Sequence, residues 1–279
     1  MEEVVSSEAT ARVFIGSSNV SRIEEKTLIH SLKKNTRGDL EIHVLKGDER
    51  LLETHCGSRI STSPILFPDE LMPYNLTNWS LLRFAVPDIC ANAGRAVYLD
   101  SDTLVLDDIG ELFRMPLADN DFAMRKSPQK PGMWASAVAL FDCAKSRFNL
   151  KTISSQLRRG IFTYRDWMWL TPAFLRFHPH RIAEIPARWH ALDSYDPETK
   201  LIHYTFIPTQ PWRCVGHPHG DLWFRYFDEA RRTGDITQKD ISTALENSCA
   251  RRDLLKGNRP DVFSSVRHHL VKAWKKIVY

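Results

Sequence analysis

Short apolar segments alternate with longer amphipathic ones along the first hundred residues. An apolar segment at 12–16 precedes a helical pattern over 23–34, and an alternating segment follows at 40–45. In the helical pattern, Leu28, Ile29 and Leu32 form a single apolar stripe. Strand, helix and strand within about 35 residues are typical of a βαβ unit. The pattern therefore predicts an α/β fold built on parallel strands.

The same patterns predict further elements as far as residue 206. We expect helices at 79–90 and 166–175, and strands at 96–100, 122–124, 137–141, 181–186 and 201–206. The stretch 51–76 is rich in Ser, Pro and polar turn residues, which predicts an irregular connection. After about Gly216 the chain becomes helical and basic. We therefore expect one domain at 11–215 and a helical C-terminal extension at 216–279.

Composition excludes several classes of protein. With 279 residues, 43% apolar and 26% charged, the chain is an ordinary globular protein with one large core. The acidic N-terminus lacks an apolar signal region, and no apolar run approaches eighteen residues, so we expect neither secretion nor a membrane span. A net charge of +4 is too small to indicate a nucleic-acid partner.

The cysteines indicate a reducing compartment. Five are present, an odd number, widely scattered and without a Cys-x-x-Cys pair: Cys56, Cys90, Cys143, Cys214 and Cys249. This spacing favours free thiols over a disulfide framework or a zinc site. We therefore expect a cytoplasmic protein.

Two aspartates follow the apolar strand at 96–99. Asp100 and Asp102 are one residue apart, and on an extended backbone such residues project from the same face. A single aspartate after a strand is common in turns, but two on one face between apolar segments favour a shared site. Two carboxylates at this spacing suit Mg²⁺ or Mn²⁺.

Other polar residues occur at the predicted ends of strands. Residues 15–17, the Asp100/Asp102 pair and His203 all lie at or near such ends. In open α/β sheets, ligands bind beyond the carboxyl ends of the strands. The sequence therefore predicts one site that these residues share.

Three segments resemble the motifs of the family 8 glycosyltransferases, which include glycogenin and bacterial lipopolysaccharide glucosyl- and galactosyltransferases. The segment 97–113, with Asp100 and Asp102, resembles the family's metal motif. The segment 80–84 resembles the helix whose arginine, here Arg83, faces the nucleotide-sugar. His203-Tyr204-Thr205 with Pro211-Trp212 resembles the closing motif that supplies a third metal ligand. The order of the three motifs is specific, whereas each alone is weak.

The resemblance implies a single GT-A domain, Rossmann-like, with a mixed and mostly parallel sheet. It implies a retaining hexosyltransferase that uses a UDP-sugar with Mn²⁺ or Mg²⁺ and a glycan, glycolipid or protein acceptor, with a role in bacterial surface polysaccharide synthesis. The implied metal ligands are Asp100, Asp102 and His203, and the implied catalytic residue near the anomeric carbon is Asp166. The implied donor-binding residues are Ile15, Gly16, Ser17, Arg83, Ser101 and Ser136.

The chain departs from the family pattern at three places. Gln210 precedes Pro211-Trp212, where the family usually has a lysine for the donor pyrophosphate. Gly16, Ser17 and Ser18 end the first strand in place of an aspartate, and Ala135 replaces a donor-binding asparagine. We therefore expect that Gln210 does not anchor phosphate and that its replacement by alanine has little effect.

Two other classes of function stay open. Gln210 and Ala135 favour a catalytically weak protein that binds a sugar nucleotide. A strand that ends in Asp100-Ser101-Asp102 is also found in haloacid-dehalogenase-type phosphatases, for which Asp235 and Asp240 offer a second acidic motif. That class needs its second motif after an apolar strand, whereas Gly234 follows a helical segment.

The last eighteen residues have a pattern of their own. In 262–279, apolar residues recur every three or four positions, and Arg and Lys residues occupy the positions between. This spacing predicts an amphipathic helix whose basic face and Trp274 suit an anionic membrane surface. A helix docked on the core or on a second subunit is the alternative.

Overall fold

An eight-stranded mixed sheet forms the centre of the protein in a computed structural model that describes residues 10–56, 59–74, 77 and 79–257. The strand order is β4-β3-β2-β1-β5-β8-β7-β9. The pairings make six strands run in one direction, with β3 and β8 opposed to them. The strands are β1 (Ala11–Ser17), β2 (Leu40–Lys46), β3 (Leu51–Cys56), β4 (Arg59–Pro64), β5 (Arg95–Asp100), β7 (Phe122–Lys126), β8 (Trp134–Asp142) and β9 (Ile182–Glu184).

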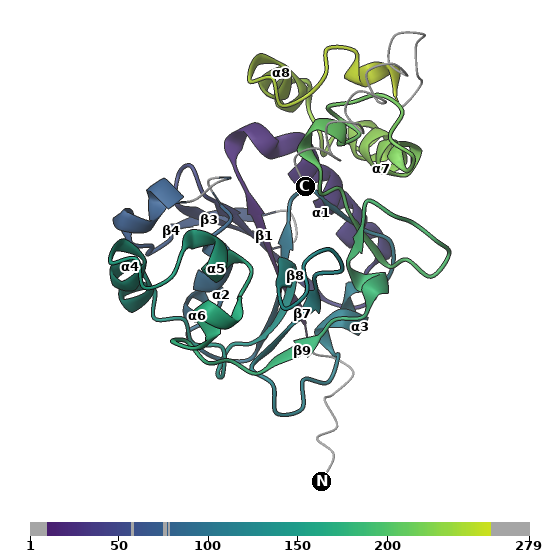
Figure 1. Ribbon diagram of the computed structural model, residues 1–279. Helices are drawn as coiled ribbons and strands as arrows, with labels where there is room; N and C mark the ends of the chain where they lie inside the picture. The colour runs from purple at the N-terminus through teal and green to yellow at the C-terminus, as the bar shows by residue number, and fades with distance from the viewer. Residues whose placement is uncertain (1–9, 57–58, 75–76, 78, 258–279) are drawn as a thin grey trace.

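Helices cover both faces of this sheet because its central strands are apolar on both sides. Val13 and Ile15 of β1 pack with α1 and α3, whereas Phe14 belongs to the cluster on the opposite face. Figure 1 shows α2, α4, α5 and α6 grouped on one side of the sheet, with α1 and α3 on the other. The helices are α1 (Arg22–Asn35), α2 (Val86–Ile89), α3 (Ile109–Phe113), α4 (Leu150–Arg158), α5 (Tyr164–Met168) and α6 (Pro172–Leu175).

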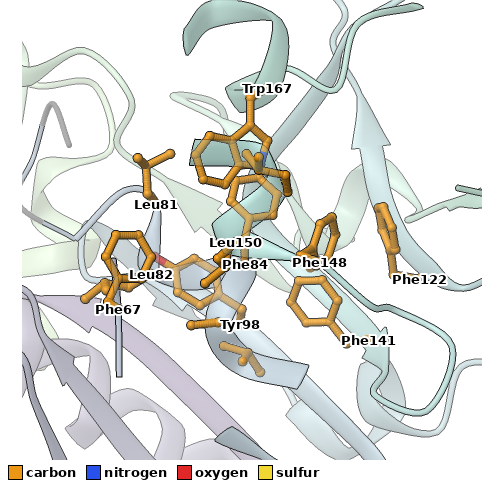
Figure 2. Packing of buried hydrophobic residues seen from close by; sticks show 14 of the residues in the cluster. Phe67, Leu81, Leu82, Phe84, Tyr98, Phe122, Phe141, Phe148, Leu150 and Trp167 are labelled. Atoms are coloured by element: carbon orange, nitrogen blue, oxygen red, sulfur yellow. The ribbon is translucent and has the colours of Figure 1, made fainter. Parts of the chain in front are cut away.

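An aromatic cluster fills the face under α2, α4, α5 and α6 (Figure 2). Phe84 lies at its centre, with ring centroids 5.0 Å from both Phe148 and Trp167. Phe84 belongs to a short 3-10 helix, Leu82–Ala85, that precedes α2. Burial of this ring fixes the 3-10 helix against β5, and with it the neighbouring Arg83.

A second, three-stranded sheet joins the C-terminal helices to the central sheet. Its order is β10-β11-β6, from β10 (Ala191–Leu192), β11 (Leu201–His203) and β6 (Thr103–Val105). The helices α7 (Gly220–Arg232) and α8 (Gln238–Glu246) lie beside α1 (Figure 1). Ile202 and Trp212 share one apolar cluster with Trp223 and Phe227 of α7. The described part of the extension therefore shares a core with the strands at the candidate site.

The predicted βαβ unit and the strands at 96–100, 122–124 and 137–141 are confirmed, with small differences at their ends. The irregular connection predicted at 51–76 is wrong in its first part, because β3 and β4 form an antiparallel hairpin there. Every residue of β4 is exposed, so this edge strand has no apolar face for a sequence pattern to show. The expected helices at 79–90 and 166–175 are each broken into shorter helical pieces.

Two predictions from composition can be compared with the structure. Among the residues that the structure describes, Cys90, Cys143 and Cys249 are free thiols. Among the described residues, no helix is both long and apolar enough to cross a bilayer. The amphipathic segment 262–279 lies outside the described residues and stays a prediction.

Candidate active site

A turn between β5 and β6 carries the two aspartates. β5 ends at Asp100, Ser101 and Asp102 form the turn, and β6 begins at Thr103, whose hydroxyl donates to Asp100 O at 2.8 Å. The expected continuous extended backbone is therefore interrupted. The turn nevertheless brings both carboxylates into one cavity, which Asp100 and Asp102 line together.

The end of β1 is bonded to this turn. Gly16 is paired with Asp100 in the sheet, and its carbonyl accepts the Ser101 N–H at 3.1 Å. A Cβ at position 16 would overlap the Tyr98 hydroxyl, which donates to Asp100 Oδ1 at 2.7 Å. Glycine here lets Tyr98 reach the carboxylate. Four of the predicted donor-binding residues are not among those that line the cavity: Ile15, Gly16, Ser17 and Ser101. Ile15, Ser17 and Ser101 are buried.

Arg83 is paired with Asp100 at the wall of the cavity. Its Nη2 lies 3.0 and 3.1 Å from the two carboxylate oxygens, and Nη1 donates to Ser136 Oγ at 2.7 Å. Nε donates to the Ser80 carbonyl, and the side chain is only 3% exposed. Burial raises the pKa of Asp100 above its usual value, and the Arg83 charge opposes this shift. The predicted donor-binding residues Arg83 and Ser136 thus line the cavity with the aspartates.

His203 reaches Asp102 through strand pairing. β11 runs antiparallel to β6, His203 is opposite Thr103, and the Tyr204 N–H donates to the Asp102 carbonyl at 3.0 Å. His203 Nε2 then lies 3.2 Å from Asp102 Oδ1. Burial acts to lower the pKa of His203, but the two carboxylates outweigh it and the pKa is raised.

These three residues fit a divalent cation. Ligand atoms of Asp100, Asp102 and His203 all lie within 4.8 Å of one another. Asp102 Oδ1 is buried and accepts no hydrogen bond from the described residues, although His203 Nε2 is close to it. Two carboxylate oxygens and one imidazole nitrogen are a donor set that binds divalent metals. The predicted triad is therefore brought together as a candidate metal site.

Gln210 is buried against one of the two aspartates. It is 3% exposed, and its Nε2 donates to Asp102 Oδ2 at 3.0 Å and to the Tyr204 carbonyl at 2.9 Å. Because the amide fixes a carboxylate of the candidate metal site, the structure predicts a larger effect of its loss than the sequence did. The polarity of a single residue could not have shown this contact, which spans 108 positions along the chain.

Gln210→Ala is therefore expected to lower stability and weaken Mn²⁺ binding together. A buried acceptor left without its donor costs about 1–3 kcal/mol, and Asp102 loses its fixed orientation. Chemical unfolding and Mn²⁺ titration measure the two effects. Gln129→Ala is the control, since Gln129 is exposed but lines the same cavity. Equal Mn²⁺ affinity in the two variants would contradict the assignment.

His190 was not identified as a site residue from the sequence. It is fully buried, and its Nε2 lies 3.0 Å from His203 Nδ1. Burial, followed by the neighbouring His203, lowers its pKa well below the usual value, so the ring is neutral. No local pattern marks this residue, because its place depends on the pairing of β10 with β11.

A cavity of about 330 Å³ connects these groups, near the lower end of the range for ligand pockets. It is also lined by Thr77, Ser80, Ser127, Gln129, Ala135, Ala137, Tyr164, Met168, Trp169, Leu192, Thr205 and Ile207. A larger cavity of about 900 Å³ lies between α4 and the loop after β4. That cavity contains none of the predicted site residues, so we place the chemistry in the smaller one.

Asp166 is not brought to this cavity. Its Oδ2 accepts hydrogen bonds from the Thr163 N–H at 2.9 Å and the Thr163 hydroxyl at 2.6 Å, and its Oδ1 accepts from Thr171. These bonds form a capping box at the start of α5 and lower the pKa of Asp166. The contacts give this carboxylate a structural role, and we do not retain it as a catalytic residue.

Glu24 lies in the first turn of α1 and is 4% exposed, with Oε2 unpaired among the described residues. Burial raises its pKa from 4.5 to about 8, and the charge of Asp102 adds to this shift. Between these pH values the unfolded chain releases the proton while the folded chain keeps it. Stability therefore falls as pH rises through this window, at up to about 1.4 kcal/mol per pH unit.

Glu24→Gln is expected to remove most of this pH dependence, because glutamine keeps the shape of the side chain and does not ionise. Relative to wild type, the variant should gain on the order of 3 kcal/mol between pH 5 and pH 8. Urea unfolding at the two pH values measures the difference. Glu246→Gln, at an exposed position of α8, is the control. Parallel pH profiles for wild type and Glu24→Gln would refute the prediction.

Comparisons with known proteins agree with this fold and site. The sequence profile of Glycosyl transferase family 8 matches residues 24–215. Protein CDI of Arabidopsis thaliana is 24% identical over 248 aligned residues, which cover 78% of this chain and 86% of that protein.

Solved structures show the same fold. The galactosyltransferase LgtC, in complex with donor and acceptor sugar analogues, superposes with a TM-score of 0.61 at 15% identity, over 83% of this chain and 99% of LgtC. The glycosyltransferase GlyE of Streptococcus pneumoniae TIGR4 gives 0.54 at 14% identity, over 81% of this chain and 64% of GlyE. The predicted mixed, mostly parallel GT-A fold is confirmed. Since the family profile covers more than half of the 279 residues, the chain belongs to glycosyl transferase family 8.

Proposed function

We propose that this glycosyltransferase transfers a hexose from a UDP-sugar to an acceptor hydroxyl with retention of configuration, and that it requires Mn²⁺ or Mg²⁺. The observation that carries the proposal is the convergence of Asp100, Asp102 and His203 within 4.8 Å at a cavity that Arg83 also lines. The resemblance of three separate motifs to family 8 supports the same reaction. The donor diphosphate and the hexose then occupy this cavity, next to the two aspartates.

Cleavage of the bond between the sugar and the phosphate leaves negative charge on the departing diphosphate. A divalent cation at the triad, when bound, neutralises that charge as a Lewis acid. Among the described residues that line the cavity, the carboxylates are those of Asp100 and Asp102, both assigned to the metal. We therefore propose attack by the acceptor oxygen on the anomeric carbon from the side of the leaving group, with its proton passing to the diphosphate oxygen.

The decisive experiment is turnover of UDP-sugars with Mn²⁺, measured as release of UDP, with and without a mixture of glycan acceptors. Release of UDP that depends on Mn²⁺ and is faster with acceptor supports the transferase. Binding of UDP-sugar without turnover would favour the catalytically weak binding protein. Release of inorganic phosphate from phosphomonoesters, with no effect of UDP-sugar, would favour a phosphatase.

The acceptor that we propose is a glycan, a glycolipid or a protein. The LgtC structure contains an acceptor sugar analogue, which supports a sugar hydroxyl as the attacking group. A role in bacterial surface polysaccharide synthesis stays a prediction, and the plant relative CDI extends the comparison beyond bacteria. Transfer of labelled sugar to an array of glycans and glycolipids identifies the class.

We also propose that the protein is cytoplasmic and binds an anionic membrane surface through residues 262–279. Each Lys or Arg near such a surface contributes about 1 kcal/mol, and this segment contains Arg267, Lys272, Lys275 and Lys276. A chain that ends at residue 261 is expected to lose binding to vesicles containing phosphatidylserine while it still releases UDP. Co-sedimentation at low and high salt measures the binding, since salt screens these charges. Full-length protein that stays in the supernatant at low salt would contradict the proposal.

A further inference from the structure

His190 is buried directly behind the metal-facing histidine. Its side chain is fully buried, and its ring lies beside that of His203, with centroids 5.2 Å apart and planes inclined by 24°. The nearest polar contact is between His190 Nε2 and His203 Nδ1, at 3.0 Å. Because the two nitrogens are in hydrogen-bond distance, one of them donates and the other accepts.

The backbone fixes this pair from both sides. β10 follows His190 directly and pairs in parallel with β11, so that Leu192 is opposite His203. The Asp193 N–H donates to the His203 carbonyl at 2.9 Å, and Arg125 donates to the His190 carbonyl. The position of His190 relative to His203 is therefore set by several bonds in addition to the contact of the two rings.

The proton of this contact decides which nitrogen of His203 is free for a metal. A ligating nitrogen must carry no proton, so a metal at Nε2 requires the proton on Nδ1. A proton on Nδ1 needs an acceptor, and His190 Nε2 is at the right distance. Nε2 of His203 lies 3.2 Å from Asp102 Oδ1, on the side where the candidate metal ligands meet.

We propose that His190 is a positioning residue, which accepts the Nδ1 proton of His203 and so keeps His203 Nε2 directed at the metal. The inference rests on the proposed metal-dependent function, and it adds a residue that none of the family motifs in this chain includes. In many metalloproteins, a carboxylate, carbonyl or water accepts the N–H of the histidine nitrogen that does not bind the metal. Here the imidazole of His190 takes that place, with Nε2 3.0 Å from His203 Nδ1. Loss of such a partner weakens metal binding by about 10- to 100-fold.

The test uses the full chain and needs no sugar donor. ¹⁵N NMR of the metal-free protein above pH 8 is expected to show His203 with the proton on Nδ1, and His203→Asn assigns the signal. Free Mn²⁺, measured by electron paramagnetic resonance, is expected to show affinity at least about tenfold weaker in His190→Leu. His190→Asn, whose amide oxygen still accepts, is expected to restore most of that loss. His178→Asn removes a half-buried histidine outside the site and is the control.

The outcomes separate this inference from the proposed function. A proton on His203 Nε2 in wild type, or wild-type Mn²⁺ affinity in folded His190→Leu, would overturn the role of His190 and leave the transferase proposal intact. If His190→Leu does not fold, the test uses His190→Asn and His190→Gln. Mn²⁺ binding as tight as that of wild type in both variants, with no proton on His203 Nδ1 in either, would also overturn the role of His190. Mn²⁺ binding that follows the expected pattern in a protein without UDP-sugar turnover supports the inference and contradicts the proposed function.

Discussion

Asp102→Asn is expected to lower Mn²⁺ affinity and UDP-sugar turnover by at least about 100-fold, the equivalent of about 3 kcal/mol. Asparagine keeps the shape of the side chain and removes its charge. Oδ1 of Asp102 is buried and lies 3.2 Å from His203 Nε2, and we propose that its charge binds the cation. Mn²⁺ titration and initial rates at saturating UDP-sugar measure the two losses.

Asp107→Asn is the matched control for this change. Asp107 lies five residues further along the same segment and is paired with Lys200 at 2.9 Å, outside the cavity. It should retain the Mn²⁺ affinity and turnover of wild type. Unchanged turnover of Asp102→Asn, after the metal has been stripped and restored, would contradict the assignment of the metal site.

Arg83→Met is expected to lower the free energy of unfolding by about 3–5 kcal/mol, which is the usual cost of breaking a buried ion pair. The change leaves the Asp100 carboxylate with the Tyr98 hydroxyl but without its cation. It also removes the donors to Ser136 and to the Ser80 carbonyl. Chemical unfolding in the absence of metal measures the loss.

Addition of Mn²⁺ should stabilise Arg83→Met more than it stabilises wild type, because the cation then replaces the missing charge beside Asp100. Arg83→Lys serves as the comparison, since lysine keeps the charge but lacks the planar fork that contacts Asp100 and Ser136 together. A loss below about 1 kcal/mol in Arg83→Met, within the range of an exposed pair, would show that this ion pair does not stabilise the fold.

The elements that the sequence predicted well are those that bury an apolar face. β1, α1, β2 and β5 have regular periodicity because each packs on the core. The β3–β4 hairpin lies at the edge of the sheet, where β4 is exposed along its whole length and nothing selects for apolar residues. Periodicity therefore reveals the strands that bury an apolar face and misses the edge formed by the β3–β4 hairpin.

The same holds for the site: residues in local sequence motifs could be predicted, and residues placed by long-range contacts could not. The aspartate pair and His203 could be proposed from the sequence because they lie in motifs with a recognisable order, and the structure brings them together. His190 and the contact of Gln210 with Asp102 depend on strand pairings between positions far apart in the chain. Asp166 shows the opposite case, because Thr163 of the capping box donates to its Oδ2, Thr171 donates to its Oδ1, and the side chain does not line the cavity.

The pairing of β11 with β6 also sets the order in which the site is completed during synthesis. Asp100 and Asp102 emerge from the ribosome about a hundred residues before His203, and chains fold from the N-terminus as they emerge. His203 is held by β10 and β6, and its neighbour Tyr204 packs in the cluster that α7 completes. A nascent chain thus acquires both carboxylates early and the imidazole late. A metal site that needs all three side chains is therefore complete only when the chain has been made at least as far as α7, residues 220–232.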